Sequence, residues 1–206
     1  MKAFILGMVL FMVGLSCIGC GRRAIIRKYY LLEAQTHMPS EQLGIGGPFT
    51  YNVDVRDFRV GPAFEQTRIA VRSGSHELDY YFYHHWAVRP STAIADMVFE
   101  LVDDTDLFQQ CFRGYSYRPD FLISGHIYSL ERVRGESDDA ARLKALIELV
   151  DMKSELSVVR HEFDRTVNLT ADGTMNEFAR TVSDIMLQET EGFIQRVGDF
   201  LKSGRQ

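Results

Sequence analysis

The residues of this chain with the most reactive side chains are its three cysteines and six histidines. Cys17 and Cys20 have the spacing of a metal or redox pair, but no second cysteine pair follows to complete such a site. His84 and His85 are neighbours in a segment that alternates like a strand, where adjacent side chains point to opposite faces and do not share one ion. Cys111 is a lone thiol, which usually packs as a small hydrophobic group. The motifs GxSxG and HExxH are absent. We therefore expect no catalytic residue, no bound metal and no cofactor.

Cys20 is suited to a different chemistry, the attachment of lipid to its thiol. Lys2 precedes an apolar run over residues 3–15, and small residues follow, which is typical of a secretory signal peptide. Cys20 lies between Gly19 and Gly21, a context that resembles the bacterial lipobox, whose cysteine receives a diacylglyceryl group before cleavage. Residues 1–19 are therefore predicted to be a lipoprotein signal peptide, and Cys20 to carry acyl chains such as palmitate. Cys17 is the alternative attachment site.

Four basic residues follow the apolar run: Arg22, Arg23, Arg27 and Lys28. By the positive-inside rule these charges would keep the downstream chain in the cytoplasm. The interpretation we favour is a tether that lies against anionic lipid headgroups. Because the residue after Cys20 is glycine rather than aspartate, we expect the periplasmic face of the outer membrane, with the periplasmic face of the inner membrane as the alternative.

The composition excludes several classes of protein. The chain of 206 residues carries 23 basic and 28 acidic side chains, and no basic stripe lies beyond the tether. A nucleic-acid partner is therefore not expected. A second long apolar run is absent, which argues against a permease. A GxxxxGK[ST] motif is also absent, which argues against a P-loop ATPase.

Hydrophobic periodicity predicts the elements of one domain over residues 49–206, after a lipidated tether, a first short strand and a loop over residues 20–48. Alternation predicts strands at 51–60, with an irregularity near Asp57, and at 69–71, 78–88, 121–127 and 159–169. Helical spacing predicts a helix from Pro90 to about residue 102. A second, long helix begins at the capping box of Thr174 and Glu177 and is interrupted on its apolar stripe only by Glu189. Residues 141–152 fit either a strand or a helix, and propensity favours the helix.

The strand at 78–88 is unusually aromatic. Its alternation assigns Tyr80, Phe82 and Trp86 to the face that supplies the core, and Tyr81 and Tyr83 to the more polar face. Helices that cover both faces would bury both tyrosines. The other reading is a contact surface for a partner protein or a second copy, because tyrosine is enriched at interfaces.

The order of these segments resembles the ABC-type transport auxiliary lipoproteins, and in particular the paraquat-inducible C-type lipoproteins. The resemblance rests on the lipobox and then on RKYYLLEA, YYFYHHWAVRP, FLISGHIYSLERV, RLKALIELVD and SVVRHEFDRTVNL, which precede the long helix. It implies an α+β fold, a mostly antiparallel sheet with two main helices packed on one face, and it favours a strand at 141–152.

The resemblance also implies a function and partners. They are those of a noncatalytic lipoprotein subunit of a lipid transport system, which docks a periplasmic bridge of the mammalian-cell-entry type to the outer membrane. The permease and the ATPase are then other chains, and a homo-oligomer is a further expectation. The alternative is a periplasmic lipid- or glycolipid-binding lipoprotein with its own apolar cavity beneath the helix that carries Phe178 and Phe193.

Overall fold

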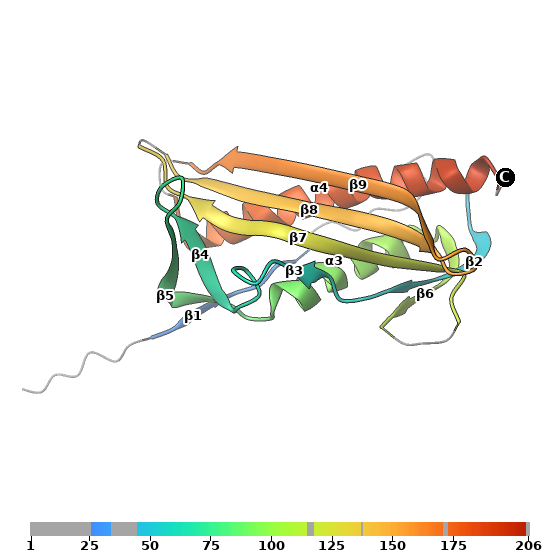
Figure 1. The fold of residues 1–206 in the computed structure, drawn as a ribbon, viewed down its shortest axis with the longest axis horizontal. Helices are drawn as coiled ribbons and strands as arrows, with labels where there is room; N and C mark the ends of the chain where they lie inside the picture. The colour runs from blue at the N-terminus through green and yellow to red at the C-terminus, as the bar shows by residue number, and fades with distance from the viewer. Residues whose placement is uncertain (1–25, 34–44, 115–117, 137, 171–172, 205–206) are drawn as a thin grey trace, which may run out of the picture.

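The computed structural model describes residues 26–33, 45–114, 118–136, 138–170 and 173–204. Within these ranges the chain forms one mixed sheet and two helices (Figure 1). In chain order the elements are β1 (Lys28–Tyr30), β2 (Phe49–Val55), β3 (Arg59–Val60), β4 (Arg68–Arg72), β5 (Leu78–Trp86), α3 (Pro90–Asp104), β6 (Phe108–Arg113), β7 (Phe121–Val133), β8 (Ala140–Asp151), β9 (Leu156–Asn168) and α4 (Met175–Lys202). The α+β fold predicted from the resemblance is confirmed. So is the break in the strand near Asp57, which separates β2 from β3.

The long strand β7 organises the sheet. One edge of β7 pairs antiparallel with β8 along its whole length, and β8 pairs antiparallel with β9. The opposite edge of β7 receives β2, β3 and β4 in turn, each in parallel. From β4 the sheet continues to β5 and β1, and from β2 it continues to β6. The antiparallel ladders are the longest, so the sheet is mostly antiparallel, as expected.

Residues 141–152 form most of strand β8, so the helix that propensity favours at this segment is wrong, and the strand that the resemblance favours is confirmed. β8 lies between β7 and β9 and pairs with both. Leu143, Ile147 and Leu149 are completely buried beneath the helices. Pairing on two edges and burial of one face outweigh the helix preference of leucine, alanine and lysine, because propensity is a weak term beside tertiary packing.

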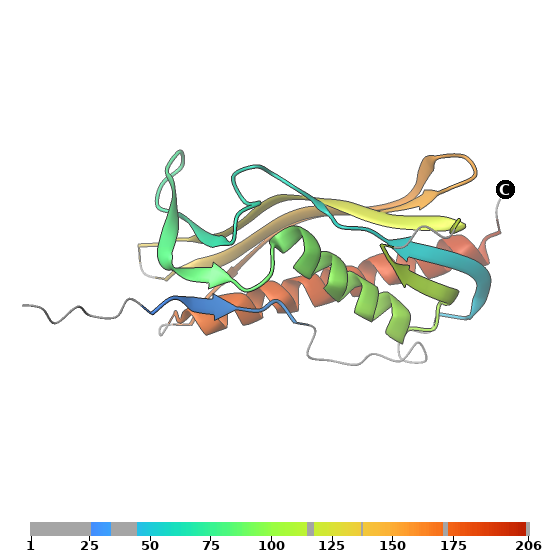
Figure 2. The same ribbon diagram turned by 90° about the horizontal axis from the view of Figure 1, so that it is seen from below.

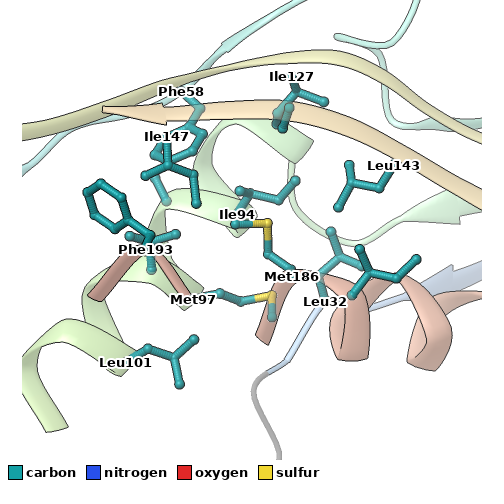
Figure 3. Packing of buried hydrophobic residues seen from close by; sticks show 14 of the residues in the cluster. Leu32, Phe58, Ile94, Met97, Leu101, Ile127, Leu143, Ile147, Met186 and Phe193 are labelled. Atoms are coloured by element: carbon teal, nitrogen blue, oxygen red, sulfur yellow. The ribbon is translucent and has the colours of Figure 1, made fainter. Parts of the chain in front are cut away.

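Both helices lie on the same face of the sheet and contact each other (Figure 2). Their apolar stripes meet the sheet in one core, which Figure 3 shows from close by. Ile94 and Met97 of α3 lie in it with Met186 and Phe193 of α4. Leu32, which follows β1, is buried in the same core. The segment after the tether is thus packed into the fold.

The long helix begins where the capping box predicts. Thr174 is the N-cap, and its hydroxyl oxygen accepts from the backbone N–H of Glu177 at 3.1 Å. The carboxylate of Glu177 accepts from the backbone N–H of Thr170 at 2.6 Å. The first bond satisfies one of the donors that the first helical turn leaves without partners, and the second ties the preceding loop to that turn. Neither helix in the described part of the chain combines the length and the apolar character needed to span a bilayer.

Candidate functional site

The predicted lipid-attachment site, Cys20, lies outside the described residues, as do Cys17, Arg22, Arg23 and the signal peptide. The first residue that the structure describes is Ile26, six positions after Cys20. Lipidation at Cys20 therefore stays a prediction. What the structure adds is the place at which the predicted tether enters the fold.

That place is the edge formed by β1 and β5. β1 pairs in parallel with β5, with Lys28, Tyr29 and Tyr30 level with residues 84–86. Tyr30 is buried, and its hydroxyl is hydrogen-bonded to Nδ1 of His84 at 2.8 Å. Burial raises the pKa of Tyr30, so this hydroxyl stays protonated at neutral pH. Figure 1 shows β1 beside β5 at one end of the molecule.

The two adjacent histidines of β5 have structural partners. Besides its bond to Tyr30, His84 is half-buried, and burial followed by the charge of Lys28 lowers its pKa. His85 is buried, and its Nε2 donates to the backbone carbonyl of Phe82 at 3.1 Å. The described residues contain no group of three or more His, Cys, Asp or Glu side chains arranged to hold a metal ion.

A register shift between β4 and β5 changes which aromatic side chains face the core. Arg68 pairs with His85, and Ala70 pairs with Tyr80, so residues 81–84 of β5 lie opposite the single residue Ile69. Trp86 is 3% exposed, as the alternation predicts, but Phe82 is 63% exposed. The assignment of Phe82 to the core is therefore wrong. The extra residues in β5 interrupt the period of two on which the assignment depends.

The same irregularity separates the two tyrosines of the predicted contact surface. Tyr81 is half-buried, packs against the core and contacts the ring of His84 at 5.4 Å between centroids. Tyr83 is 43% exposed. Its ring contacts the neighbouring ring of Phe82 edge to face, at 4.9 Å between centroids. The structure thus brings Tyr83 together with Phe82, a residue that the alternation had placed on the other face.

Further apolar side chains are exposed on β1 and just before it, along the strand that pairs with β5. Ile26 is 74% exposed and Tyr29 is 61% exposed. Ile26 lies two residues before Lys28, which pairs with His84, and Phe82 lies two residues before His84. We call Ile26, Tyr29, Phe82 and Tyr83 the edge surface. It combines large apolar side chains that a folded protein normally buries or uses in an interaction.

A polar cleft adjoins β1 on the side of the long helix. Its volume is about 530 Å³, and it lies between the chain around Tyr29–Glu33 and the first turns of α4. Glu33, Glu177 and Asp184 line it together with Arg180. The backbone N–H of Glu33 donates to Oγ of Ser183 at 3.2 Å, which ties the segment after β1 to α4.

A buried polar cluster joins α4 to β9. Glu189 accepts from Nε2 of His161 at 2.7 Å and from Nε of Arg165 at 2.5 Å. Burial raises the pKa of Glu189, but the hydrogen bonds from Arg165 and His161 outweigh burial and hold that pKa below its usual value. Nδ1 of His161 is buried and has no hydrogen-bond partner among the described residues. The sequence marks Glu189 as the polar member of an apolar stripe but does not identify its two partners.

The remaining thiol, Cys111 in β6, lies half-buried against the core. Burial, with the nearby charges of Asp103 and Asp54, raises its pKa to about 12. Because the thiolate is the nucleophilic form, this cysteine is unreactive at neutral pH. Its packing agrees with the prediction of a small hydrophobic group.

The chain is similar to one protein family and to several solved structures. The sequence profile of the ABC-type transport auxiliary lipoprotein component family matches residues 30–191. A crystal structure of a protein from Xanthomonas campestris has a TM-score of 0.65 at 15% identity, over 85% of this chain and 94% of that chain. A crystal structure of an uncharacterised protein has a TM-score of 0.59 at 9% identity, over 84% of this chain and 99% of that one. A PelC dodecamer from Paraburkholderia phytofirmans has a TM-score of 0.43 at 10% identity, over 69% of this chain and 87% of that one. No curated protein sequence matches.

Proposed function

This chain belongs to the ABC-type transport auxiliary lipoprotein component family, and we propose that it is a noncatalytic, lipid-anchored subunit of an ABC-type lipid transport system. In this role it docks a periplasmic bridge protein of the mammalian-cell-entry type to the outer membrane. The observation that carries the proposal is the extent of the family match, which begins in β1 and ends within α4. It therefore includes β2 to β9 in full, as well as α3.

The position of β1 supports an anchor at Cys20. Ile26 lies six positions after Cys20, and an extended chain of that length reaches about 20 Å. Tyr30 and Leu32 are buried in the fold, so packing of the domain begins ten positions after Cys20. An acylated Cys20 would hold the β1–β5 edge close to the membrane. The glycine after Cys20 favours the outer membrane over the inner membrane.

The state of the reactive side chains supports a noncatalytic role. The raised pKa of Cys111 disfavours its thiolate. The imidazoles of His84 and His85 are engaged in hydrogen bonds within β1 and β5. The proposal accordingly assigns the chemistry of transport to the permease and ATPase chains, and binding to this one.

The packing beneath α4 favours docking over the alternative of a lipid-binding cavity. Phe178 and Phe193, which would line such a cavity, are completely buried in the core. The ring of Phe178 lies 5.8 Å from that of Trp86, between centroids. The residues beneath the helix thus fill the space that an enclosed acyl chain would need. Large apolar side chains are instead exposed on the edge surface.

Affinity purification of the full-length protein from membranes solubilised in mild detergent tests this proposal. We expect a protein of the mammalian-cell-entry type to co-purify, together with a permease and an ATPase. Cys20→Ala should abolish this recovery, whereas Cys111→Ala is the matched control that should retain it. Recovery of the protein alone, with a lipid bound in native mass spectra, would contradict docking and support the cavity alternative.

A further inference from the structure

The edge surface exposes large apolar side chains where most of a folded surface is polar. Ile26, Phe82 and Tyr83 are 74%, 63% and 43% exposed. Two of them, Phe82 and Tyr83, are adjacent in sequence and would point to opposite faces of a regular strand. Because residues 81–84 bulge opposite Ile69, their rings instead contact each other on the outside of the fold. The irregularity thus gathers apolar area that a regular strand would distribute over two faces.

Basic side chains flank this apolar area. Arg27 and Lys28 are exposed in the same segment as Ile26, and Arg22 and Arg23 precede them in the sequence. Exposed acidic residues also lie nearby, at Asp79 on β5, Glu33 after β1 and Asp184 on α4, so the basic charge is concentrated in the segment that precedes and begins β1. Aromatic rings beside Lys and Arg are the combination found where proteins meet the headgroup region of a bilayer.

The geometry of the chain also fixes what this surface meets. With acyl chains on Cys20, the tether of six residues keeps Ile26 within about 20 Å of the membrane. β1 begins two residues after Ile26 and pairs with β5 from Lys28 and His84 onward. The β1–β5 edge is therefore the part of the fold that such an anchor brings closest to lipid.

We propose that the edge surface lies in the headgroup region of the anionic bilayer that holds the anchor, with Phe82 and Tyr83 inserted between lipids and Arg27 and Lys28 against phosphates. This inference rests on the lipid anchor of the proposed function. Its consequence is a fixed orientation: the fold rests on the membrane along the β1–β5 edge and presents the opposite end of the sheet to the periplasm.

The test uses tryptophan as a reporter of lipid contact. Full-length protein purified from membranes, carrying Phe82→Trp, is reconstituted in vesicles of phosphatidylethanolamine and phosphatidylglycerol with brominated acyl chains. Leu156→Trp is the matched control, because Leu156 is 65% exposed and lies at the start of β9, at the end of the sheet away from β1. Trp86 is buried and contributes the same background to both variants.

We expect brominated lipid to quench the tryptophan fluorescence of the Phe82→Trp variant, whose emission should also lie to the blue because its ring is among lipids. The fluorescence intensity of the Leu156→Trp variant should be the same in brominated and unbrominated vesicles. Tyr83→Trp is a second reporter at the same surface, should Phe82→Trp fail to show native circular dichroism. If the emission of the Phe82→Trp and Tyr83→Trp variants is the same in brominated as in unbrominated vesicles, the proposal is overturned. So would emission of Phe82→Trp that responds only to added partner protein or to protein concentration, since the surface would then be a protein interface. The intact mass of the same samples keeps the two proposals apart: acylated protein without quenching refutes the surface alone, and protein without acyl chains refutes the anchor.

Discussion

Replacing Glu189 by leucine should destabilise the fold even though it makes the apolar stripe of α4 continuous. Glu189 is 6% exposed. Within the described part of the chain, its carboxylate is the only hydrogen-bond acceptor of Nε2 of His161. The other ring nitrogen, Nδ1, already has no partner there. With leucine at 189 the imidazole would be buried without any hydrogen bond.

The expected loss of stability is the sum of three contributions, from the His161 ring, the Arg165 ion pair and the new leucine side chain. A buried donor left without its partner costs about 1–3 kcal/mol. Loss of the ion pair with Arg165 adds at most about 1 kcal/mol, because the Arg165 side chain is 61% exposed. The extra apolar surface that leucine buries offsets about 1 kcal/mol. We therefore expect a net loss of about 2 kcal/mol, which lowers the Tm by roughly 4–8 °C in a protein of this size.

A double-mutant cycle checks the reasoning. His161→Leu alone should also destabilise, because it leaves the Glu189 carboxylate buried with only Arg165 as partner. In the double variant both polar partners are gone and Arg165 is free to turn to solvent. The double variant should then lose less stability than either single variant. Thermal unfolding followed by circular dichroism measures all four proteins. Losses that simply add in the double variant would refute the coupling of His161 to Glu189.

Three further predictions concern the core and its titratable groups. Gly125→Ala should lower the free energy of unfolding in urea by about 1–3 kcal/mol, because an added Cβ would overlap the ring of Phe58. The control Gly46→Ala, whose Cβ would meet nothing closer than 3.7 Å, should leave the stability unchanged. An unchanged stability of Gly125→Ala would contradict the packing of Gly125 against Phe58. Because the pKa of Glu189 is held below its usual 4.5, its ionised form stabilises the fold above that pH, and this stability is lost as the pH falls through the lowered pKa. Wild type should therefore lose more stability than Glu189→Gln from about pH 5 to about pH 3, and equal losses would refute this. Cys111, with its pKa raised to about 12, should react with a thiol reagent at pH 7 far more slowly in the folded than in the unfolded protein, and equal rates would refute its burial.

Sequence patterns predict the elements whose signal is local. The start of α4 follows from the Thr174 hydroxyl and the spacing to Glu177, both of which act within one turn. β8 does not follow from local preference, since its leucines, alanines and lysine favour a helix and only its two neighbouring strands make it a strand. Its recovery from the resemblance shows that the order of segments carries information that propensity lacks.

The candidate site depends most on long-range pairing and is accordingly the least predictable part. The alternation of β5 predicts that Tyr83 belongs to a contact surface, but it places Tyr83's companion Phe82 in the core. The bulge that exposes Phe82 arises from pairing with β4, where Ile69 lies opposite several residues. A similar limit applies to Glu189, whose polar character is visible in the sequence while its partners come from β9.

The proposed function requires that acyl chains on Cys20 hold this family member to a membrane. The intact mass of the protein purified from membranes, wild type beside Cys20→Ala, tests it most directly. We expect a mature wild-type chain that starts at residue 20 and carries added acyl mass, which Cys20→Ala abolishes. A wild-type chain that keeps residues 1–19 and has no added mass would show that Cys20 is not the anchor and would indicate a signal anchor instead.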